Sequence, residues 1–271
     1  MMARFGYLDG DSFFHQMDPS WKLLWNILFV GMVILNFDLV YSVDCLVYIV
    51  VLTLVVSRIY IRRYVRSLMV FLSLALFVAV WKSLYYVWDE TEVVHVWFSW
   101  GPIAMTREGV VEGVASFFRI LVVVSVSLLF TLTTNPVRLV DSLIQIAGLP
   151  YRIGYAVYAA MRFIPLYENE ARVISNAHQI RGVGETGKGL LSKLRLYRSI
   201  LIPLLVSGIR RAQRTSIAMD SRAFGAHDVR TMIREANVSL VTKIFVLGHG
   251  VAAVVAFYYY IVLGHGAHFI G

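Results

Sequence analysis

Five apolar stretches, each close to the length that crosses a lipid bilayer, constrain this chain more than any other feature of its sequence. A spanning helix needs about 20 mostly apolar residues. The chain has 271 residues, of which 58% are hydrophobic and only 15% are charged, whereas a soluble domain has roughly 25% charged residues. Most of the charges lie between the apolar stretches. The sequence therefore predicts an integral membrane protein with one polar region.

The expected spanning helices are residues 21–37, 39–57, 65–88, 110–133 and 239–263. Charged side chains inside them include Lys82 in the third span, and Glu112 and Arg119 in the fourth. A long charged side chain near the end of a span can extend its head group to the interface. We therefore interpret these positions as interfacial, and not as a substrate pathway.

The orientation of the chain follows from the basic residues of its short loops, because lysine and arginine favour the cytoplasmic side. The segment 58–66 carries four arginines and no acidic residue, whereas the loop before the fourth span is mainly acidic. Residues 134–237 carry fifteen Lys or Arg against seven Asp or Glu. We expect a multi-pass plasma membrane protein with its amino terminus and residues 134–237 in the cytoplasm and its carboxyl terminus outside.

The segment between the fourth and fifth spans is expected to be helical without crossing the membrane. An Asn-Pro pair opens a short amphipathic helix at residues 137–146. Two long helices follow at 151–181 and 190–223, and the arginines that recur along both of them exclude an ordinary span. Between these two helices, the four glycines of residues 182–189 break the helical pattern.

These expectations together define the fold class. The chain is predicted to be an all-α integral membrane protein, with about five transmembrane helices and a cytoplasmic region of one short and two long amphipathic helices. The predicted domains are an N-terminal membrane region at residues 1–133, the cytoplasmic region at 134–237 and a C-terminal transmembrane helix at 238–271.

The second long helix gathers basic residues on one side. At 100° per residue, Arg211, Arg214 and Arg222 fall within an arc of about 80°. One interpretation is that this face rests on anionic lipid head groups of the membrane. The other is that it docks on a protein, because guanidinium groups suit carboxylates and backbone carbonyls. The residues alone favour neither interpretation.

Several short motifs, in their order along the chain, resemble those of a known family. Residues 10–22, GDSFFHQMDPSWK, are similar to an opening S-x-x-H-x-x-D-P-x-x-K pattern, and residues 133–136, TTNP, contain a T-x-P pattern after the fourth span. Two Ala-Arg-Gly-like motifs end the long helices: Ile180-Arg181-Gly182 and Ser221-Arg222-Ala223. The whole chain thus resembles the transmembrane T-component of energy-coupling factor (ECF) transporters, the EcfT/CbiQ family. It departs from the pattern in the residues that flank both arginines, except for Gly182.

The resemblance implies a non-catalytic subunit of an ATP-driven importer, with residues 134–237 as its coupling region. In that family two cytoplasmic ABC-type ATPases each receive one arginine-bearing helix end. Docking is thereby assigned to Ile180, Arg181, Gly182, Ser221, Arg222 and Ala223, with Arg211 and Arg214 as an additional basic docking face. The long helices would cradle a small substrate-binding membrane protein, the S-component. ATP and Mg²⁺ would be bound by the ATPases, so no cofactor is expected on this chain. The cargo would be a micronutrient, either a vitamin or Co²⁺ or Ni²⁺.

Other motifs indicate less. Residues 182–189, GVGETGKG, approach a phosphate-binding loop, but Gly189 replaces the hydroxyl residue that ligates Mg²⁺, and the segment follows a helix. His265 and His268 have no third metal ligand nearby in sequence, and the single Cys45 excludes a thiolate cage. The net charge of +8 is explained by cytoplasmic loops, so no nucleic acid partner is expected.

Two other functions stay open from the residues. The permease subunit of a conventional ABC importer carries an E-A-A…G pattern, which Glu170-Ala171-Arg172 begins but does not complete with a glycine at the right distance. A self-sufficient secondary transporter should show inverted repeats or polar residues near the centres of several spans. Neither is evident in the sequence.

Overall fold

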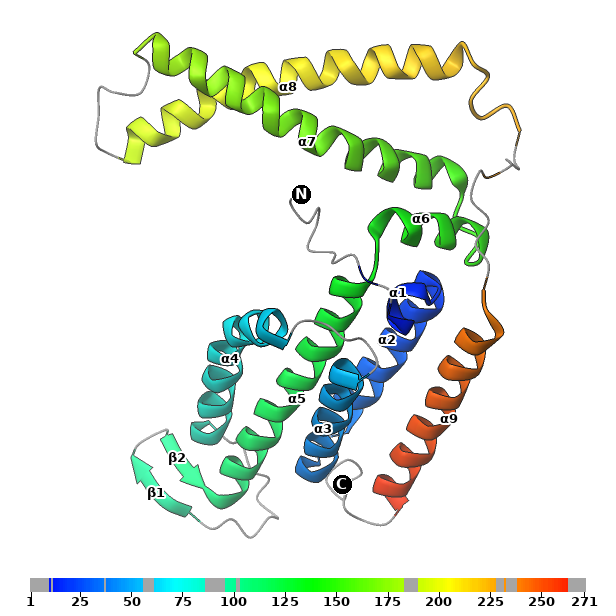
Figure 1. The fold of residues 1–271 in the computed structure, drawn as a ribbon. Helices are drawn as coiled ribbons and strands as arrows, with labels where there is room; N and C mark the ends of the chain where they lie inside the picture. Colours follow the sequence, from blue (N-terminus) through cyan, green and yellow to red (C-terminus); the bar gives the residue numbers. More distant parts are fainter. Residues whose placement is uncertain are drawn as a thin grey trace. The chain divides into compact units, whose positions relative to one another are not determined.

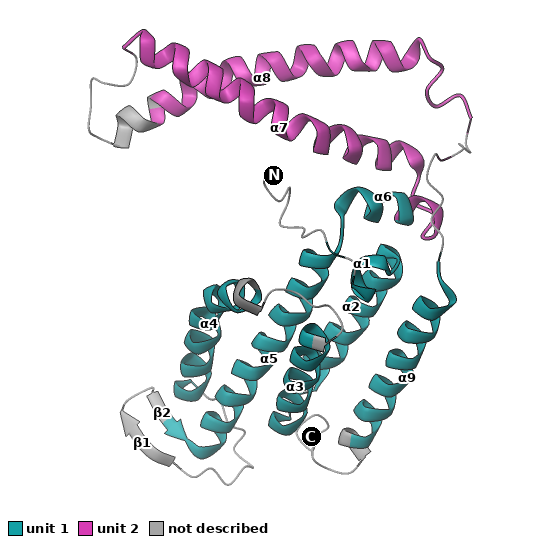
Figure 2. Cartoon of the chain, viewed as in Figure 1, with its two compact units in different colours: residues 1–142, 236–271 teal, residues 143–235 magenta. Residues whose placement is uncertain are grey.

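The computed structural model describes residues 10, 12–36, 38–55, 61–85, 96–100, 103–182, 190–227, 232 and 238–262. Within these ranges the chain forms nine α-helices and one two-stranded antiparallel sheet (Figure 1). It divides into two compact units (Figure 2). We call residues 1–142 with 236–271 the membrane unit, and residues 143–235 the helix-pair unit.

Most elements belong to the membrane unit. They are α1 (Phe13–Gln16), α2 (Pro19–Leu35), α3 (Leu39–Val55), α4 (Ile61–Leu84), β1 (Val96–Trp100), β2 (Ile103–Thr106), α5 (Arg107–Thr133), α9 (Leu240–Val262) and most of α6 (Pro136–Gln145). The helix-pair unit contains α7 (Tyr151–Ile180) and α8 (Leu190–Asp220). The short helix and the two long helices expected between the fourth and fifth spans are therefore all present.

The first part of the membrane unit extends into α6 and ends after Ser142. The physical reason is that Ser142 is hydrogen-bonded to Asp18 and Ser20 near the start of α2. The last helix, α9, also joins this unit, because Phe245 packs against Phe14 and Trp25.

Helix α5 is the centre of the membrane unit and contacts α2, α3 and α4. In the most apolar 18-residue segment of α5, 44% is buried. In the corresponding segments of α4 and α9 the buried share is only 11%. Its inward face carries apolar and small residues at helical spacing, including Leu121, Val122, Val126, Leu129 and Leu132. The other helices therefore pack around a hydrophobic α5.

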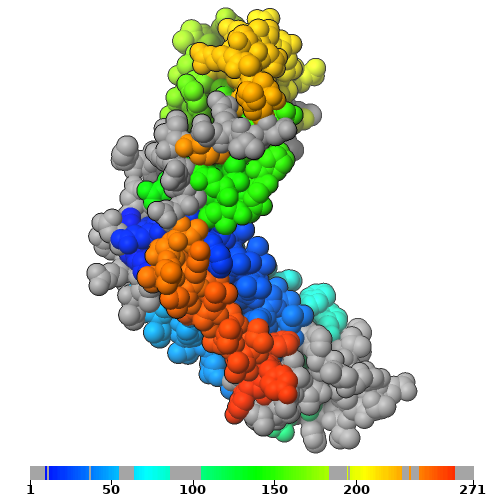
Figure 3. Space-filling view, turned by 90° about the vertical axis from the view of Figure 1, so that its right-hand side faces the viewer, coloured from blue at the N-terminus to red at the C-terminus, as the bar shows by residue number. Residues whose placement is uncertain are grey.

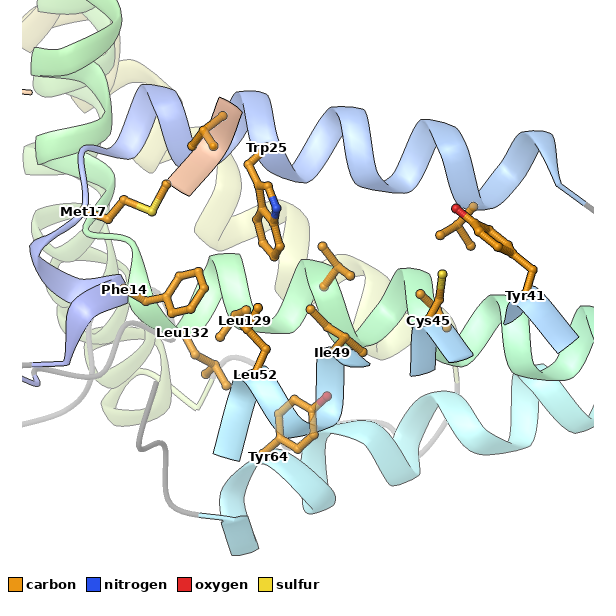
Figure 4. Packing of buried hydrophobic residues seen from close by; sticks show 14 residues of the cluster. Phe14, Met17, Trp25, Tyr41, Cys45, Ile49, Leu52, Tyr64, Leu129 and Leu132 are labelled. Atoms are coloured by element: carbon orange, nitrogen blue, oxygen red, sulfur yellow. The ribbon is translucent and has the colours of Figure 1, made fainter. Parts of the chain in front are cut away.

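The buried cluster runs along α2, α3 and α5 (Figure 4). Ile49 and Leu52 of α3 face Leu129 of α5 (Figure 4). Trp25 of α2 belongs to the same cluster and lies near Phe14. Aromatic rings close the end near the amino terminus, where Phe14 lies 5.9 Å from Trp25 between ring centroids. Apolar packing between these helices thus positions the α5 carboxyl end from which α6 begins.

The outer faces of α4 and α9 are apolar and exposed. On α4, Val70 is 70% exposed and Phe77 64%; on α9, Val251 and Tyr258 are similarly open. Figure 3 shows the α9 side of the membrane unit, with α9 in orange and red beside the blue α2. Such faces suit lipid acyl chains, so the unit has the surface of a membrane protein.

Among the described residues, three helices are long and apolar enough to cross a membrane: Tyr64–Leu84, Arg107–Thr133 and Leu240–Tyr259. Helices α2 and α3 are apolar but have 17 residues each. At 1.5 Å per residue they rise about 25 Å, slightly less than the hydrocarbon core of about 30 Å. The expectation of five spans is thus confirmed for three helices, and the other two are shorter apolar helices that a locally thinned bilayer would accommodate.

The all-helical class is confirmed, and one short hairpin of β1 and β2 accompanies the helices. Its strands pair antiparallel, with Ser99 opposite Ala104 and Trp100 opposite Ile103. Aromatic and β-branched residues favour strands, and they gather in β1. Helix α4 also begins at Ile61, ahead of the expected start at residue 65.

Helices α4 and α5 approach each other closely at Gly113. A Cβ atom placed there would lie 2.5 Å from the Ala79 carbonyl oxygen and would overlap Ser83 Oγ. Beside this contact, Lys82 Nζ and Glu112 Oε2 form an ion pair at 3.2 Å. Lys82 and Glu112, two of the charged residues that the sequence places inside spans, are therefore paired with each other across the α4–α5 interface.

We predict that Gly113→Ala lowers the free energy of unfolding by about 1–3 kcal/mol, because the new methyl group overlaps a backbone carbonyl that cannot rotate away. The matched control is Gly31→Ala on α2, where nothing lies within 4 Å of the added Cβ. Thermal unfolding of the purified protein in detergent measures both. Equal midpoints for the two variants would contradict the close approach.

Candidate functional site

The candidate site begins with the antiparallel pair of α7 and α8 (Figure 1). At one end, Tyr151 Oη donates to the His227 carbonyl at 2.8 Å, and Arg152 Nη2 donates to the Gly225 carbonyl at 2.8 Å. Towards the other end, His178 Nε2 donates to the Ser199 carbonyl at 3.2 Å. The start of α7 therefore lies beside the end of α8. The carboxyl ends of the two helices point to opposite ends of the pair.

Polar contacts join the two helices where they cross. Glu170 of α7 accepts hydrogen bonds from Ser207 Oγ and from Arg211 Nη2, the latter at 3.2 Å. The Arg211 guanidinium also lies 5.8 Å from the centroid of the Tyr167 ring. Gly208 allows this approach, because a Cβ there would lie 2.8 Å from Tyr167 Oη. The crossing is thus fixed by a half-buried ion pair rather than by apolar packing alone.

This geometry separates the arginines that the sequence groups on one face of α8. Arg211 is directed to Glu170 of the neighbouring helix. Arg214 is exposed, and its Nε donates to the Arg210 carbonyl on the same helix at 3.3 Å. Arg222 lies beyond the end of α8 in an exposed turn. Arg211 therefore links α7 to α8, and the exposed basic groups are Arg214 and Arg222.

The turn after α8 has the hydrogen bonds of a Schellman helix ending. The Ala223 amide donates to the Asp220 carbonyl and the Phe224 amide to the Met219 carbonyl, both at 3.0 Å. Ala223 has φ 54°, the left-handed conformation that glycine usually occupies. The Phe224 ring then packs against Tyr155 of α7, 4.8 Å between centroids. This contact holds the turn against the first turns of α7.

The end of α7 has the same local form. Gly182 has φ 68°, and its amide donates to the Gln179 carbonyl at 3.0 Å. In both turns an exposed arginine, Arg181 or Arg222, directly precedes the left-handed residue. Ile180, next to Arg181, is 88% exposed, which is unusual for a large apolar side chain. The two motifs that sequence alone aligns loosely therefore share an arginine, a left-handed residue after it and the hydrogen bond of that residue's amide.

A second polar cluster lies in the membrane unit, where α2, the end of α5 and α6 meet. Lys22 is 1% exposed, and its Nζ donates to the Thr133 carbonyl at 3.2 Å and to Thr133 Oγ1 and Thr134 Oγ1 at 3.3 Å. Asp18, at the start of α2, accepts from Ser142 Oγ at 2.5 Å. The opening and T-x-P motifs are therefore in direct contact. The sequence indicates neither this contact nor the part of Ser142, which belongs to neither motif.

The described residues contain no group of three His, Cys, Asp or Glu side chains placed to hold a metal ion. His265, His268 and the glycine-rich residues 183–189 lie outside the described part of the chain. Cys45 is buried in the core of the membrane unit.

The family described as cobalt transport protein, CbiQ, matches residues 10–233, most of the chain. The chain belongs to this family. The family match covers the membrane unit up to Ser142 and nearly all of the helix-pair unit.

Two relatives illustrate the similarity. The EcfT transmembrane protein of Lactococcus lactis subsp. cremoris is 34% identical over 236 residues, covering 84% of this chain and 86% of the relative. The EcfT protein of Brevibacillus brevis is 30% identical over 266 residues, or 95% of each chain. These similarities confirm the resemblance seen in the motifs. This chain is thus the transmembrane, non-ATPase component of an ECF transporter, and not a conventional permease or secondary transporter.

The equivalence of the two helix ends gives opposite predictions for two substitutions. Gly182→Ala forces a Cβ into a left-handed residue and should destabilise the last turn of α7 by about 1 kcal/mol, whereas Ala223→Gly should stabilise the turn after α8 by a similar amount. Nothing lies within 4 Å of the Cβ added at Gly182, so the effect is confined to the backbone.

Hydrogen exchange with mass spectrometry measures both effects at the last-turn amides, where 1 kcal/mol changes the exchange rate about fivefold. Exchange should become faster in the Gly182→Ala variant and slower in the Ala223→Gly variant. A change of the same sign in both variants would contradict the shared geometry.

Proposed function

We propose that this chain couples two cytoplasmic ABC-type ATPases to a small substrate-binding membrane protein, the S-component. The observation that carries the proposal is the pair of equivalent ends, each with an exposed arginine before a left-handed residue. Helix α7 has 30 residues, so the two ends of the antiparallel pair stand about 45 Å apart. Two separate motor subunits could each receive one end. A single small partner could not hold both.

The docking contacts follow from the residues at each end. At the α7 end they are Ile180, Arg181 and Gly182, and at the α8 end Ser221, Arg222 and Ala223; Arg214 supplies a further exposed basic group on α8. An exposed guanidinium can donate in fork geometry to carboxylates or carbonyls of a partner groove. The exposed Ile180 side chain would be buried in the same contact. A helix end that inserts into a groove of a partner needs apolar and charged groups side by side, and the α7 end has both.

The sides of the helix pair are suited to a membrane partner. Large apolar residues are exposed along α8, including Leu201, Leu205 and Ile209, and along α7, including Ile164 and Val173. The arginines among them oppose insertion of the pair into lipid. A surface that is apolar but cannot be immersed fits the cytoplasmic face of another membrane protein, together with lipid head groups. The S-component is proposed to lie there.

The proposed mechanism is mechanical. ATP and Mg²⁺ bind on the ATPases, whose closure moves the two docked ends relative to each other. The Glu170–Arg211 ion pair and the Phe224–Tyr155 contact join α7 to α8, so displacement of one end is transmitted to the other helix. The surface under the S-component then shifts and helps it release its cargo inward. The cargo is proposed to be a micronutrient, a vitamin or Co²⁺ or Ni²⁺, bound by the S-component.

In this orientation the amino terminus and the helix-pair unit face the cytoplasm, and the carboxyl terminus faces outwards. The basic excess of residues 134–237 supports it. Four crossings, with α2 and α3 among them, precede the helix pair and return the chain to the side of its amino terminus. The fifth crossing, by α9, then places the carboxyl terminus on the other side.

The docking assignment predicts that Arg181→Glu combined with Arg222→Glu releases the ATPases. Losing one partner of a buried charged contact costs about 2–5 kcal/mol, and each reversal also introduces a repelled charge. The complex is purified in detergent through a tag on this chain, and ATPase stoichiometry is measured.

The matched control is Arg172→Glu combined with Arg210→Glu, which reverses two exposed arginines in the middle of the same helices. This control should keep its ATPases, and both variants should insert into the membrane equally. Stoichiometric ATPases in the Arg181→Glu, Arg222→Glu variant would overturn the assignment.

A further inference from the structure

The polar cluster between α2, α5 and α6 has a geometry that the docking function does not use. We call Asp18, Ser20, Lys22, Thr133, Thr134 and Ser142 the polar junction. Each of these side chains is buried, with exposures from 1% to 9%. All of them lie in the membrane unit. They are far apart in sequence, so the junction forms only when three helices are brought together.

Lys22 closes the end of α5. The last carbonyls of a helix have no partner within it, and a cation is stabilised by the negative end of the helix dipole. The Lys22 ammonium has three protons, and three oxygen atoms at the α5 end, belonging to Thr133 and Thr134, lie within 3.3 Å of it. The side chain therefore attaches the first turn of α2 to the residues that lead into α6.

Asp18 makes the matching attachment on the other side of the turn. It caps α2 by accepting from the Ser20 amide at 3.0 Å, and it also accepts from Ser142 Oγ. Because the Ser142 proton is used in that bond, the Ser20 hydroxyl donates to Ser142 Oγ, at 2.5 Å. The same turn of α2 thus holds the end of α5 through Lys22 and the body of α6 through Asp18 and Ser20.

The place of Ser142 in the chain gives these bonds their consequence. Ser142 is the last residue of the membrane unit before the chain passes to the helix pair. Only residues 146–150 separate the end of α6 from α7. A buried lysine is not needed for stability, since an apolar side chain of similar volume is often equally stabilising in such a place. Hydrogen bonds have preferred angles, whereas apolar packing does not, so these bonds fix the orientation of α6 relative to α2.

We propose that Lys22, Asp18 and Ser142 are positioning residues that fix α6 to α2, so that force from the helix pair moves the membrane unit instead of turning α6. This inference rests on the proposed function for its consequence in transport, but the attachment of α6 is a property of the chain itself.

Two readouts test the proposal in the complete transporter. Spin labels on exposed residues of α2 and α6, at Leu28→Cys and Arg138→Cys with Cys45→Ala, report the distance between the helices. Reconstitution in liposomes reports cargo uptake per ATP hydrolysed. The variants are Lys22→Met, which keeps the length without the charge, Ser142→Ala, which removes one hydroxyl, and Lys22→Arg as the conservative replacement.

We expect the Lys22→Met and Ser142→Ala variants to keep their ATPases and to hydrolyse ATP. The distribution of distances between the spin labels should become broader. Uptake per ATP should fall about tenfold, because a hydrogen bond to a charged group is lost. Lys22→Arg should recover part of both readouts. If Lys22→Met does not fold, the Ser142→Ala variant alone tests the proposal. This substitution adds no volume, and Lys22 keeps its hydrogen bonds to Thr133 and Thr134.

Unchanged label distances in a folded variant would overturn the proposal, and so would broadened distances with normal uptake per ATP. Failure of the proposed function looks different, because ATPases would then be missing from the complex of the unsubstituted chain. The label distances would in that case still decide whether the junction holds α6.

Discussion

The structure depends on the cost of placing arginine in lipid. An arginine at the centre of a spanning helix costs about 2.5–3.5 kcal/mol, and α7 and α8 carry exposed arginines along their lengths, among them Arg162, Arg172, Arg210 and Arg214. Their arginines disfavour placing these two helices in the hydrocarbon, although apolar residues lie between the charges. The membrane unit has the opposite character, with an apolar core around α5 and apolar outer faces. One chain thus combines an apolar membrane unit with a helix pair whose exposed surface is both apolar and basic.

Two kinds of contact hold these parts, and they have different consequences. Apolar packing among α2, α3 and α5 is strong but has little directional preference. Hydrogen bonds and ion pairs occur where an angle between helices matters, at the Glu170–Arg211 crossing and at Lys22 in the polar junction. In the account proposed here, force enters at the ends bearing Arg181 and Arg222, passes through the crossing, and reaches the membrane unit by way of α6.

The sequence predicted the elements well and their contacts poorly. Composition and periodicity located the helices within a few residues, because charge-free segments and helix-breaking residues are local signals. The motifs identified the family and both arginine-bearing ends. Local signals cannot report that Arg211 turns to Glu170 or that Lys22 reaches Thr133 across more than a hundred residues of chain, since these contacts exist only after packing. The β1–β2 hairpin was missed because its short strands lie between long helices that dominate the hydropathy pattern.

The central claim is that the helix pair stands on the cytoplasmic side of the membrane. It is tested most directly by labelling with a membrane-impermeant maleimide, using Asn176→Cys on α7 and Gln213→Cys on α8, both exposed, after replacing the single native Cys45 by alanine. The account predicts no labelling in intact cells and full labelling once the membrane is permeabilised. Labelling of either position in intact cells would place the helix pair outside and contradict the account.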